Sequence, residues 1–263
     1  MKFATFKSNG KSHYGAIHDA GIAALDPLFP EWPTLFDVVK NNGLSTLKDA
    51  AEEAEISHEN IEYDMVLPNV RRILCMGVNF PERNAEYKDH SAAPKYMSLF
   101  VRFPSSFTGH NQPLVRPPEN KTLDYEGEVA IAIGKGGRRI SKARAYDHIA
   151  ALTISNEGTI RDWVRHAKFN VTQGQNWDCS GALGPWLVPF KDAVQLDEAR
   201  VITRVNGEIR QDDKLNRIVF PVRDIVAYVS TFMTLKAGDV IITGTATGAG
   251  ARFDPPRYLS PGD

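Results

Sequence analysis

The sequence has few cysteines, no long apolar run and no excess of charge of either sign. Cys75 and Cys179 are its only cysteines and lie far apart, which excludes a disulfide-stapled fold or a zinc ribbon. Lys and Arg number 31 against 32 Asp and Glu, so the formal charge of −1 lacks the basic excess of nucleic-acid-binding proteins. We therefore expect a protein with reduced cysteines and no nucleic-acid partner.

The amino-acid sequence also shows no pattern typical of a membrane span or a secretory signal. No segment approaches 18 consecutive apolar residues, and the start, MKFATFKSNG, lacks the apolar stretch of a secretory signal. A chain of 263 residues can bury a core without disulfides or a structural metal. These features predict a globular cytoplasmic protein with no membrane partner.

The chain divides by pattern into a small leading module, 1–67, and a larger remainder, 68–263. The first part combines short alternating stretches with two helical segments, and Ser45 is the predicted N-cap of the second helix. Leu67-Pro68 ends this part ahead of a new apolar run at 71–80. We therefore predict a small N-terminal α+β module followed by one large domain.

Beyond residue 67 the pattern is mostly strands punctuated by Pro and Gly. Apolar residues spaced i, i+3, i+4 and i+7 predict a helix with one buried face over 159–169. A second apolar stripe, opened by Pro221 and ended by Gly238, predicts a helix over 221–235. Strands outnumber helices and do not alternate with them regularly, so we predict an α+β fold that is mainly β.

Three glutamates are the most informative polar residues. Glu126 and Glu128 flank Gly127 at the start of an apolar strand, so their side chains share a face about 6.6 Å apart along the strand. Glu157 follows another apolar strand, just before the predicted helix. Carboxylates this close repel unless a proton or a cation lies between them, and a hard divalent cation fits oxygen ligands. The alternative is a solvated strand face and an acidic helix start.

The order of several motifs resembles the fumarylacetoacetate hydrolase family, in its acylpyruvase and 2-hydroxyhepta-2,4-diene-1,7-dioate isomerase branch. The motifs are, in chain order, GVNF with a short helix-like segment, RFPSSF, the Glu-x-Glu strand, an Asn-acid pair before a helix, GPW, a VNGE hairpin and a TGT–Gly loop. The resemblance implies a mixed β-sandwich roll, a homodimer, and Mg²⁺ or Mn²⁺ held in a catalytic domain over 68–263 by Glu126, Glu128 and Glu157. The family usually has Asp at the third position, so the Glu157 side chain is one methylene longer.

The same resemblance assigns catalytic positions. It places Glu86 at the family's acid–base glutamate, Arg83 where a histidine base usually stands, and Gln175 where a lysine usually stands. Arginine is not a base at neutral pH, and glutamine carries no charge. It also matches Thr245 to a threonine that meets the substrate carboxylate, while Arg102 and His110 are further candidates for gripping a small anionic 2-oxo or dienol carboxylate.

Three activities remain open on these residues. Family weight favours metal-dependent hydrolysis of a C–C bond in an acylpyruvate-type 2-oxo acid, through a metal-stabilised enolate. Isomerisation or decarboxylation of a ring-cleavage 2-hydroxy-dienoate dicarboxylate, as in aromatic catabolism, depends less on the replaced residues. A diverged metal- and ligand-binding protein with little turnover is the alternative from another class.

Overall fold

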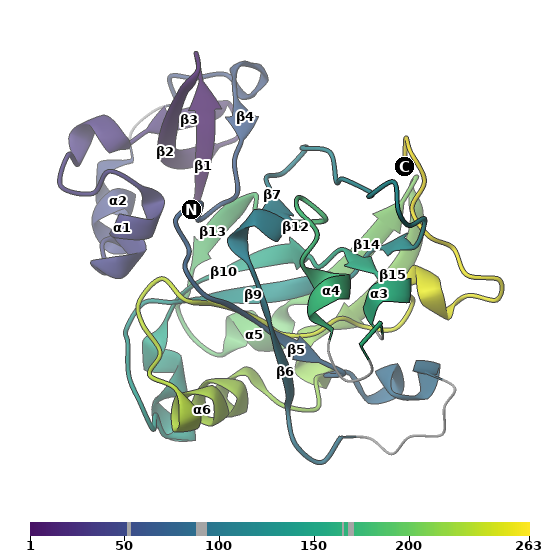
Figure 1. Cartoon of the computed structure of the whole chain (residues 1–263). Helices are drawn as coiled ribbons and strands as arrows, with labels where there is room; N and C mark the ends of the chain where they lie inside the picture. Colours follow the sequence, from purple (N-terminus) through teal and green to yellow (C-terminus); the bar gives the residue numbers. More distant parts are fainter. Residues whose placement is uncertain (52–53, 88–93, 165, 168–170) are drawn as a thin grey trace.

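The computed structural model describes residues 1–51, 54–87, 94–164, 166–167 and 171–263, and a large mixed sheet forms its centre (Figure 1). Within these residues, twelve strands belong to this sheet: β1 (Lys2–Ser8), β2 (Lys11–His18), β3 (Gly21–Ala24), β4 (Glu62–Tyr63), β5 (Ile73–Gly77), β6 (Ser98–Arg102), β7 (Phe107–Thr108), β9 (Gly127–Ile133), β10 (Ile149–Asn156), β12 (Gly181–Leu183), β13 (Trp186–Pro189) and β16 (Val240–Ile242). Nine of them follow the order β3-β2-β1-β13-β10-β9-β16-β5-β6, while β4, β7 and β12 lie off this path.

Two small sheets and several short helices complete the described part of the chain. The small sheets pair β8 (Leu123–Asp124) with β11 (Thr159–Ile160), and β14 (Arg200–Val205) with β15 (Glu208–Lys214). The α-helices are α1 (Leu35–Lys40), α2 (Leu44–Ala50), α3 (Arg161–Val164), α4 (Thr172–Gln175), α5 (Val194–Glu198) and α6 (Val222–Phe232). No helix among the described residues is long and apolar enough to cross a membrane. The predicted α+β class, mainly β, is confirmed.

The leading segment is joined to the main sheet rather than held apart from it. Strand β1 pairs with β13 through Phe3 and Ala4, opposite Leu187 and Trp186. Figure 1 shows β1–β3 with α1 and α2 (purple) at one end of this sheet. The same buried cluster contains side chains from both sides of residue 67, including Phe3 and Val240. The boundary at residue 67 therefore stays a prediction, because core packing continues across it.

Two apolar clusters fill the sheet's two faces around its central strands. Along β9, Ala130 and Ala132 belong to one cluster, while Val129, Ile131 and Ile133 belong to the other. This division follows from the alternation of side chains along a strand. The second cluster also contains the buried stripe of α6. A helix is therefore present where 221–235 was predicted, with Pro221 at its N-terminal edge, but it ends at Phe232, because Met233 is extended and Leu235 bridges to Gly137.

Two local predictions are wrong. Residues 159–169 do not form one helix: Thr159 and Ile160 pair with β8, and α3 covers only Arg161–Val164 with no fully buried side chain. Residues 165, 168 and 169 of that stretch lie outside the described residues. Ser45 is not an N-cap, because α2 begins at Leu44 and Gly43 occupies the cap position.

The central strands set the geometry of the polar site. Strand β9 pairs antiparallel with β10 and with β16, and β16 runs parallel to β5. Loops that follow β5 and β16 therefore leave the sheet at the same edge. The loop that starts at residue 78 after β5 and the loop 243–245 after β16 meet there, where the Asn79 amide donates to the Thr243 carbonyl at 2.7 Å.

Candidate active site

Three buried glutamates meet where β9 and β10 pair. Register places Gly127 opposite Asn156, so Glu126 and Glu157 emerge side by side, and the Glu157 N–H donates to the Glu126 carbonyl at 2.8 Å. Glu128 lies one residue into the same pairing, opposite Ser155. One carboxylate oxygen from each of the three lies within 4.8 Å of the others. Antiparallel pairing therefore gathers carboxylates from two separate strand ends.

The donor set fits a divalent cation. Glu126, Glu128 and Glu157 are 5%, 1% and 1% exposed, so water does not screen their repulsion. Among the described residues, Oε1 of Glu157 is buried without a hydrogen-bond partner, although buried carboxylate oxygens are normally satisfied. Carboxylate oxygens are the ligands that Mg²⁺ and Mn²⁺ prefer, and Oε1 of Glu157 is free to coordinate such a cation.

The protonation balance of the three carboxylates points the same way. Burial, opposed by Arg102 and reinforced by Glu126, raises the pKa of Glu157 to about 7. Burial and then the neighbouring Glu157 and Glu126 raise the pKa of Glu128 well above its ordinary value. Without a cation it is therefore unfavourable for all three carboxylates to be ionised, and a bound cation would favour their ionised forms.

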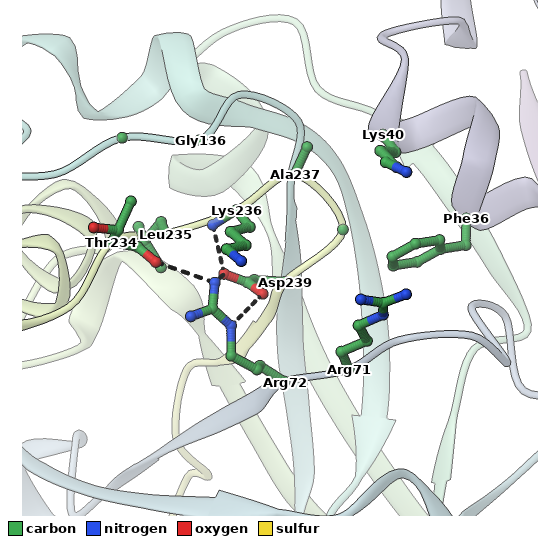
Figure 2. Close-up of a pocket in the computed structure, with 12 residues that line it drawn as sticks. Phe36, Lys40, Arg71, Arg72, Gly136, Thr234, Leu235, Lys236, Ala237 and Asp239 are labelled. Carbon is green, nitrogen blue, oxygen red and sulfur yellow. Dashed lines mark hydrogen bonds and ion pairs between the residues drawn. The ribbon is translucent and has the colours of Figure 1, made fainter.

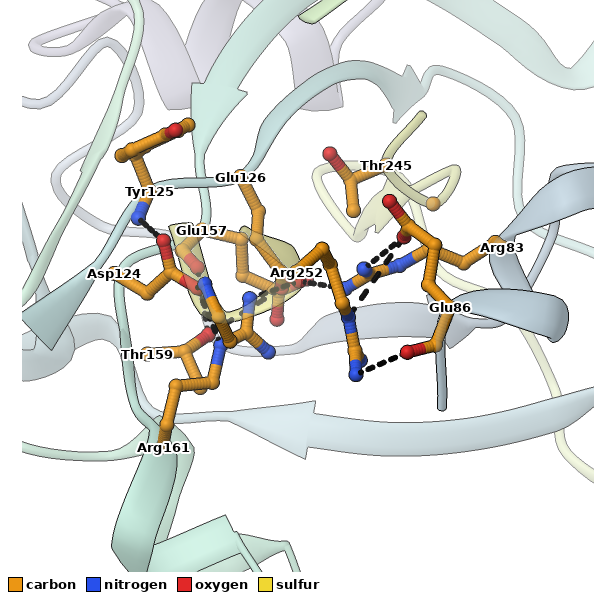
Figure 3. A network of polar contacts seen from close by, with 12 residues as sticks. Arg83, Glu86, Asp124, Tyr125, Glu126, Glu157, Thr159, Arg161, Thr245 and Arg252 are labelled. Atoms are coloured by element: carbon orange, nitrogen blue, oxygen red, sulfur yellow. Dashed lines mark hydrogen bonds and ion pairs between the residues drawn. The ribbon is translucent and has the colours of Figure 1, made fainter. Parts of the chain in front are cut away.

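Glu126 differs from the other two because two arginines hold it (Figure 3). Its Oε1 accepts from Arg161 Nη2 at 2.6 Å and from Arg83 Nη2. Burial alone would raise the pKa of Glu126, but Arg161 and Arg83 hold it below its ordinary value. Arg161 is itself fixed by the fully buried Asp124, whose Oδ2 accepts from Arg161 Nε at 2.6 Å. Glu126 is therefore the carboxylate that stays ionised.

Arg83 and Glu86 form the next shell of contacts. Arg83 is 3% exposed, and its Nη1 donates to Glu86 Oε2 at 2.7 Å. The other Glu86 oxygen, Oε1, accepts from the Gly248 N–H at 2.9 Å. Arg252 adds a third contact, with Nε 3.7 Å from Glu86 Oε2. The chain Glu86–Arg83–Glu126 thus links the predicted acid–base group to the carboxylate cluster.

A cavity of about 180 Å³ lies beside the glutamates, and we call it the acid cavity. Six of the predicted site residues line it: Arg83, Glu126, Glu128, Glu157, Gln175 and Thr245. Apolar side chains, including Met76, Leu99 and Phe100, also line it. Glu86 is not part of the lining and reaches the cavity through Arg83. This volume lies below that of drug-sized ligand sites, so the cavity has room only for a small substrate.

Arg102 and His110 do not belong to this cavity, which corrects their predicted role in substrate binding. Arg102 is 0% exposed and spends its donors on the Ser106 hydroxyl and carbonyl, the Gly158 carbonyl and the Ser180 hydroxyl. It braces the loop behind Glu157 instead of facing a ligand. His110 is exposed and packs edge-on against Tyr63, with ring centroids 5.3 Å apart.

Gln211, on β15, is a site residue that the sequence did not reveal. Its Oε1 accepts from the Gly127 N–H at 2.9 Å, between the two metal-ligand candidates. Its Nε2 donates to Thr245 Oγ1 and to the Ala246 carbonyl, both at 2.8 Å. Gln211 is 1% exposed, so no water replaces these bonds. No local motif marks it, because the contacts join segments more than 30 residues apart.

Asn79 was part of the recognised GVNF motif, but its role emerges only from the structure. Its side-chain amide donates to the Thr243 carbonyl at 2.7 Å and accepts from the Phe220 N–H at 2.9 Å. The preceding Val78 has φ of +50°, a conformation that costs a β-branched residue about 1–3 kcal/mol. The strained turn places Val78 in the lining of the acid cavity.

The fold and the site together define a class: a mixed-sheet protein with a buried carboxylate triad suited to a divalent cation. Residues 72–263 match the family described as fumarylacetoacetate (FAA) hydrolase, C-terminal. The chain belongs to the fumarylacetoacetate hydrolase family.

Its relatives and structural neighbours carry tautomerase, isomerase and hydrolase names. The chain is 39% identical to the oxaloacetate tautomerase YisK of Bacillus subtilis, over 73% of this chain and 64% of that protein, so it spans under two thirds of that relative. It is 32% identical to the mitochondrial oxaloacetate tautomerase FAHD2A of Homo sapiens, over 91% of this chain and 77% of that protein. A solved probable 2-hydroxyhepta-2,4-diene-1,7-dioate isomerase from Mycobacterium abscessus superposes with a TM-score of 0.82 at 26% identity, covering 100% of this chain and 92% of that chain.

Proposed function

We propose that the protein catalyses metal-dependent keto–enol tautomerisation of a small 2-oxo dicarboxylate, with oxaloacetate as the first substrate to test. The observation that carries this proposal is the ion-paired Arg83, which stands at the position expected for a histidine base. Its guanidinium is committed to Glu126 and Glu86, and none of the described residues lining the acid cavity is a histidine. Tautomerisation moves protons and consumes no water, so it needs no water-activating pair.

The carboxylates of Glu126, Glu128 and Glu157 would hold Mg²⁺ or Mn²⁺. When bound there, the cation supplies Lewis-acid polarisation of the substrate's 2-oxo and carboxylate oxygens. The acid cavity's apolar wall lowers the local dielectric and strengthens that polarisation. The human and Bacillus subtilis relatives named as oxaloacetate tautomerases support the choice of reaction.

Glu86 is the proposed acid–base residue. Its side chain is 15% exposed, and the Gly248 N–H and Arg83 hold the two oxygens in fixed directions. Because Glu86 does not line the acid cavity, in the keto-to-enol direction it accepts the C3 proton through a bridging water; the C2–C3 double bond forms, and the same proton returns by that route to the C2 oxygen. Thr245 and Gln175 line the cavity and offer a hydroxyl and an amide to the substrate carboxylates. No C–C bond breaks.

Hydrolysis of an acylpyruvate, the reaction favoured by the resemblance to the family, is the second candidate. It requires a base that activates water and a group that stabilises the leaving enolate. Glu86 alone remains for the first task, and the neutral Gln175 offers only a hydrogen bond for the second. Isomerisation of a 2-hydroxy-dienoate dicarboxylate shares the proton transfers of the tautomerase, and the expected homodimer and cytoplasmic location remain predictions.

One assay separates these activities. Metal-loaded protein is mixed with enol-oxaloacetate, with an acetylpyruvate and with a 2-hydroxy-dienoate dicarboxylate, while ultraviolet absorbance follows enol loss and chromatography follows products. We expect fast ketonisation of enol-oxaloacetate without release of pyruvate or carbon dioxide. Cleavage of acetylpyruvate with no effect on enol-oxaloacetate would overturn the proposal in favour of hydrolysis. Turnover of none of the three would favour a binding protein.

A further inference from the structure

Figure 2 shows the lining of a second and larger cavity, of about 660 Å³. This cavity lies at the ends of β5 and β16 that are far from the glutamates. Arg71 and Arg72 line it just before β5 begins, and Asp239 lines it just before β16 begins. Both strands then run to the acid cavity, whose lining includes Gly77 at the end of β5 and Thr245 just beyond β16. Five residues of β5 at about 3.3 Å each separate the two cavities by about 16.5 Å.

The lining of this second cavity is strongly cationic, and we call it the basic cavity. Lys40, Arg71, Arg72 and Lys236 line it together with a single carboxylate, that of Asp239. Both oxygens of Asp239 already accept hydrogen bonds: Oδ1 from Arg72 Nε at 2.8 Å and Oδ2 from the Lys236 backbone N–H at 2.7 Å. The concentration of positive charge is notable in a chain whose formal charge is −1.

Three of these cations carry no compensating contact. Lys40, Arg71 and Lys236 are exposed, and no ion pair or side-chain hydrogen bond joins them to any residue that the structure describes. Several like charges around one hollow raise its positive potential and attract multivalent anions. Arginine and lysine are also the side chains that hydrogen-bond phosphate, sulfonate and carboxylate groups.

An aromatic ring adds an apolar surface to the same cavity. Phe36, on α1 of the leading module, lines it with Leu235 and Ala237. In the view of Figure 2 the Phe36 ring lies between the Lys40 and Arg71 side chains. Gly238 packs so closely on this ring that a Cβ there would lie 2.3 Å from Phe36 Cε2. The contact fixes the ring against the 236–239 turn, so the apolar wall is preformed.

We propose that the basic cavity binds an organic anion that has two or more negative charges and a flat apolar group. The three uncompensated cations select the charges, and Phe36 with its apolar neighbours selects the ring. A volume of about 660 Å³ is far larger than an inorganic anion needs and falls in the range of small-molecule sites. The site is separate from the acid cavity, so a ligand here leaves the glutamates open.

Calorimetric titration of the metal-loaded protein with naphthalene-1,5-disulfonate tests the proposal, because a sulfonate competes poorly for the divalent cation. We expect saturable binding at one site per chain that weakens as salt is added. The double variant K40Q/R71Q should bind at least about tenfold more weakly, since each lost charge-assisted contact contributes. The charge-conserving variant K40R/R71K should retain binding, as should K11Q, which changes an exposed lysine on β2.

Methanedisulfonate, which has the charges without the ring, should bind at least about tenfold more weakly than the naphthalene compound. Three results would overturn the proposal. These are no saturable binding of naphthalene-1,5-disulfonate, equal binding by K40Q/R71Q with an unchanged melting curve, and equal binding of methanedisulfonate. The substituted side chains are exposed, so both double variants should fold.

Discussion

The acid cavity and the basic cavity occupy opposite ends of the same two strands and use charge in opposite ways. In the acid cavity the charged groups are buried, and Glu126 is held by ion pairs with Arg83 and Arg161. In the basic cavity Lys40, Arg71 and Lys236 are exposed and uncompensated. Removing one partner of a buried ion pair strongly destabilises a protein, whereas removing an exposed cation changes the free energy of unfolding little. Substitutions at the two ends should therefore differ sharply.

The largest effect is expected from Glu128→Gln, which keeps the size of the side chain and removes one anionic metal donor. Turnover that depends on Mg²⁺ or Mn²⁺ should fall by more than about a hundredfold, because losing even a residue that only contacts a metal ligand typically costs about 10- to 100-fold. Metal content by mass spectrometry should fall with it. Glu62→Gln, at an exposed position on β4, is the matched control. Unchanged activity and metal content in E128Q would remove the metal assignment.

Arg161→Met should destabilise the protein more than any exposed charge change. It leaves Asp124, which is 0% exposed, and Glu126 without a cation that both contact. Breaking a buried pair typically costs about 3–5 kcal/mol. Urea unfolding of metal-free protein measures the change. Arg144→Met removes an exposed ion pair with Asp147 and should cost under about 1 kcal/mol. Equal losses in the two variants would show that burial does not govern the acid cavity.

Gln211→Ala tests whether the β14–β15 hairpin positions the acid cavity. Losing the bonds to Gly127, Thr245 and Ala246 should raise KM for the substrate about tenfold, with a smaller change in kcat, because Thr245 is proposed to bind substrate. Gln211→Glu keeps an acceptor for Gly127 but loses the donor, so it should resemble the alanine variant. Gln195→Ala, on α5, is the control. An unchanged KM in both Gln211 variants would leave this residue with a structural role only.

The sequence predicted the acid cavity far better than the basic one, for a physical reason. Glu126 and Glu128 sit two residues apart on one strand, so local periodicity already places them together, and motif order added Glu157. The order of motifs also pointed to Thr245 and Gln175, and both residues line the acid cavity. The basic cavity joins α1, the start of β5 and the 234–239 turn, segments that no local pattern connects.

Where the sequence was misleading, long-range pairing overrode a local preference. The 159–169 stripe predicted a helix, but Thr159 and Ile160 hydrogen-bond with β8 instead. Arg102 was predicted to grip the substrate carboxylate, yet its guanidinium is fully buried and donates to the Gly158 carbonyl and to the hydroxyls of Ser106 and Ser180. Gln211 offered no signal, because its three partners lie on other elements.

Metal removal should expose the carboxylate repulsion in the acid cavity as a dependence of stability on pH. Burial raises the pKa of Glu157 to about 7 without a cation, above its ordinary unfolded value. Stability from the protonated group is then present below the unfolded pKa and is lost as the pH rises through the folded one. The melting temperature of EDTA-treated protein should therefore be lower at about pH 8 than at about pH 6. Manganese should restore more stability at the higher pH, and an equal gain at both would contradict the raised pKa.

The smallest effect is expected at the basic cavity, and it completes the contrast. Lys236→Gln removes an exposed cation that contacts no described carboxylate through its side chain, so the free energy of unfolding should change by less than about 0.5 kcal/mol. The direction should be stabilising at low salt, because the change relieves repulsion among Lys40, Arg71 and Arg72, and it should vanish as salt screens that repulsion. Urea unfolding at two ionic strengths measures both. A loss of more than about 1 kcal/mol would show that Lys236 holds the fold, and the two ends of β5 and β16 would then use charge alike.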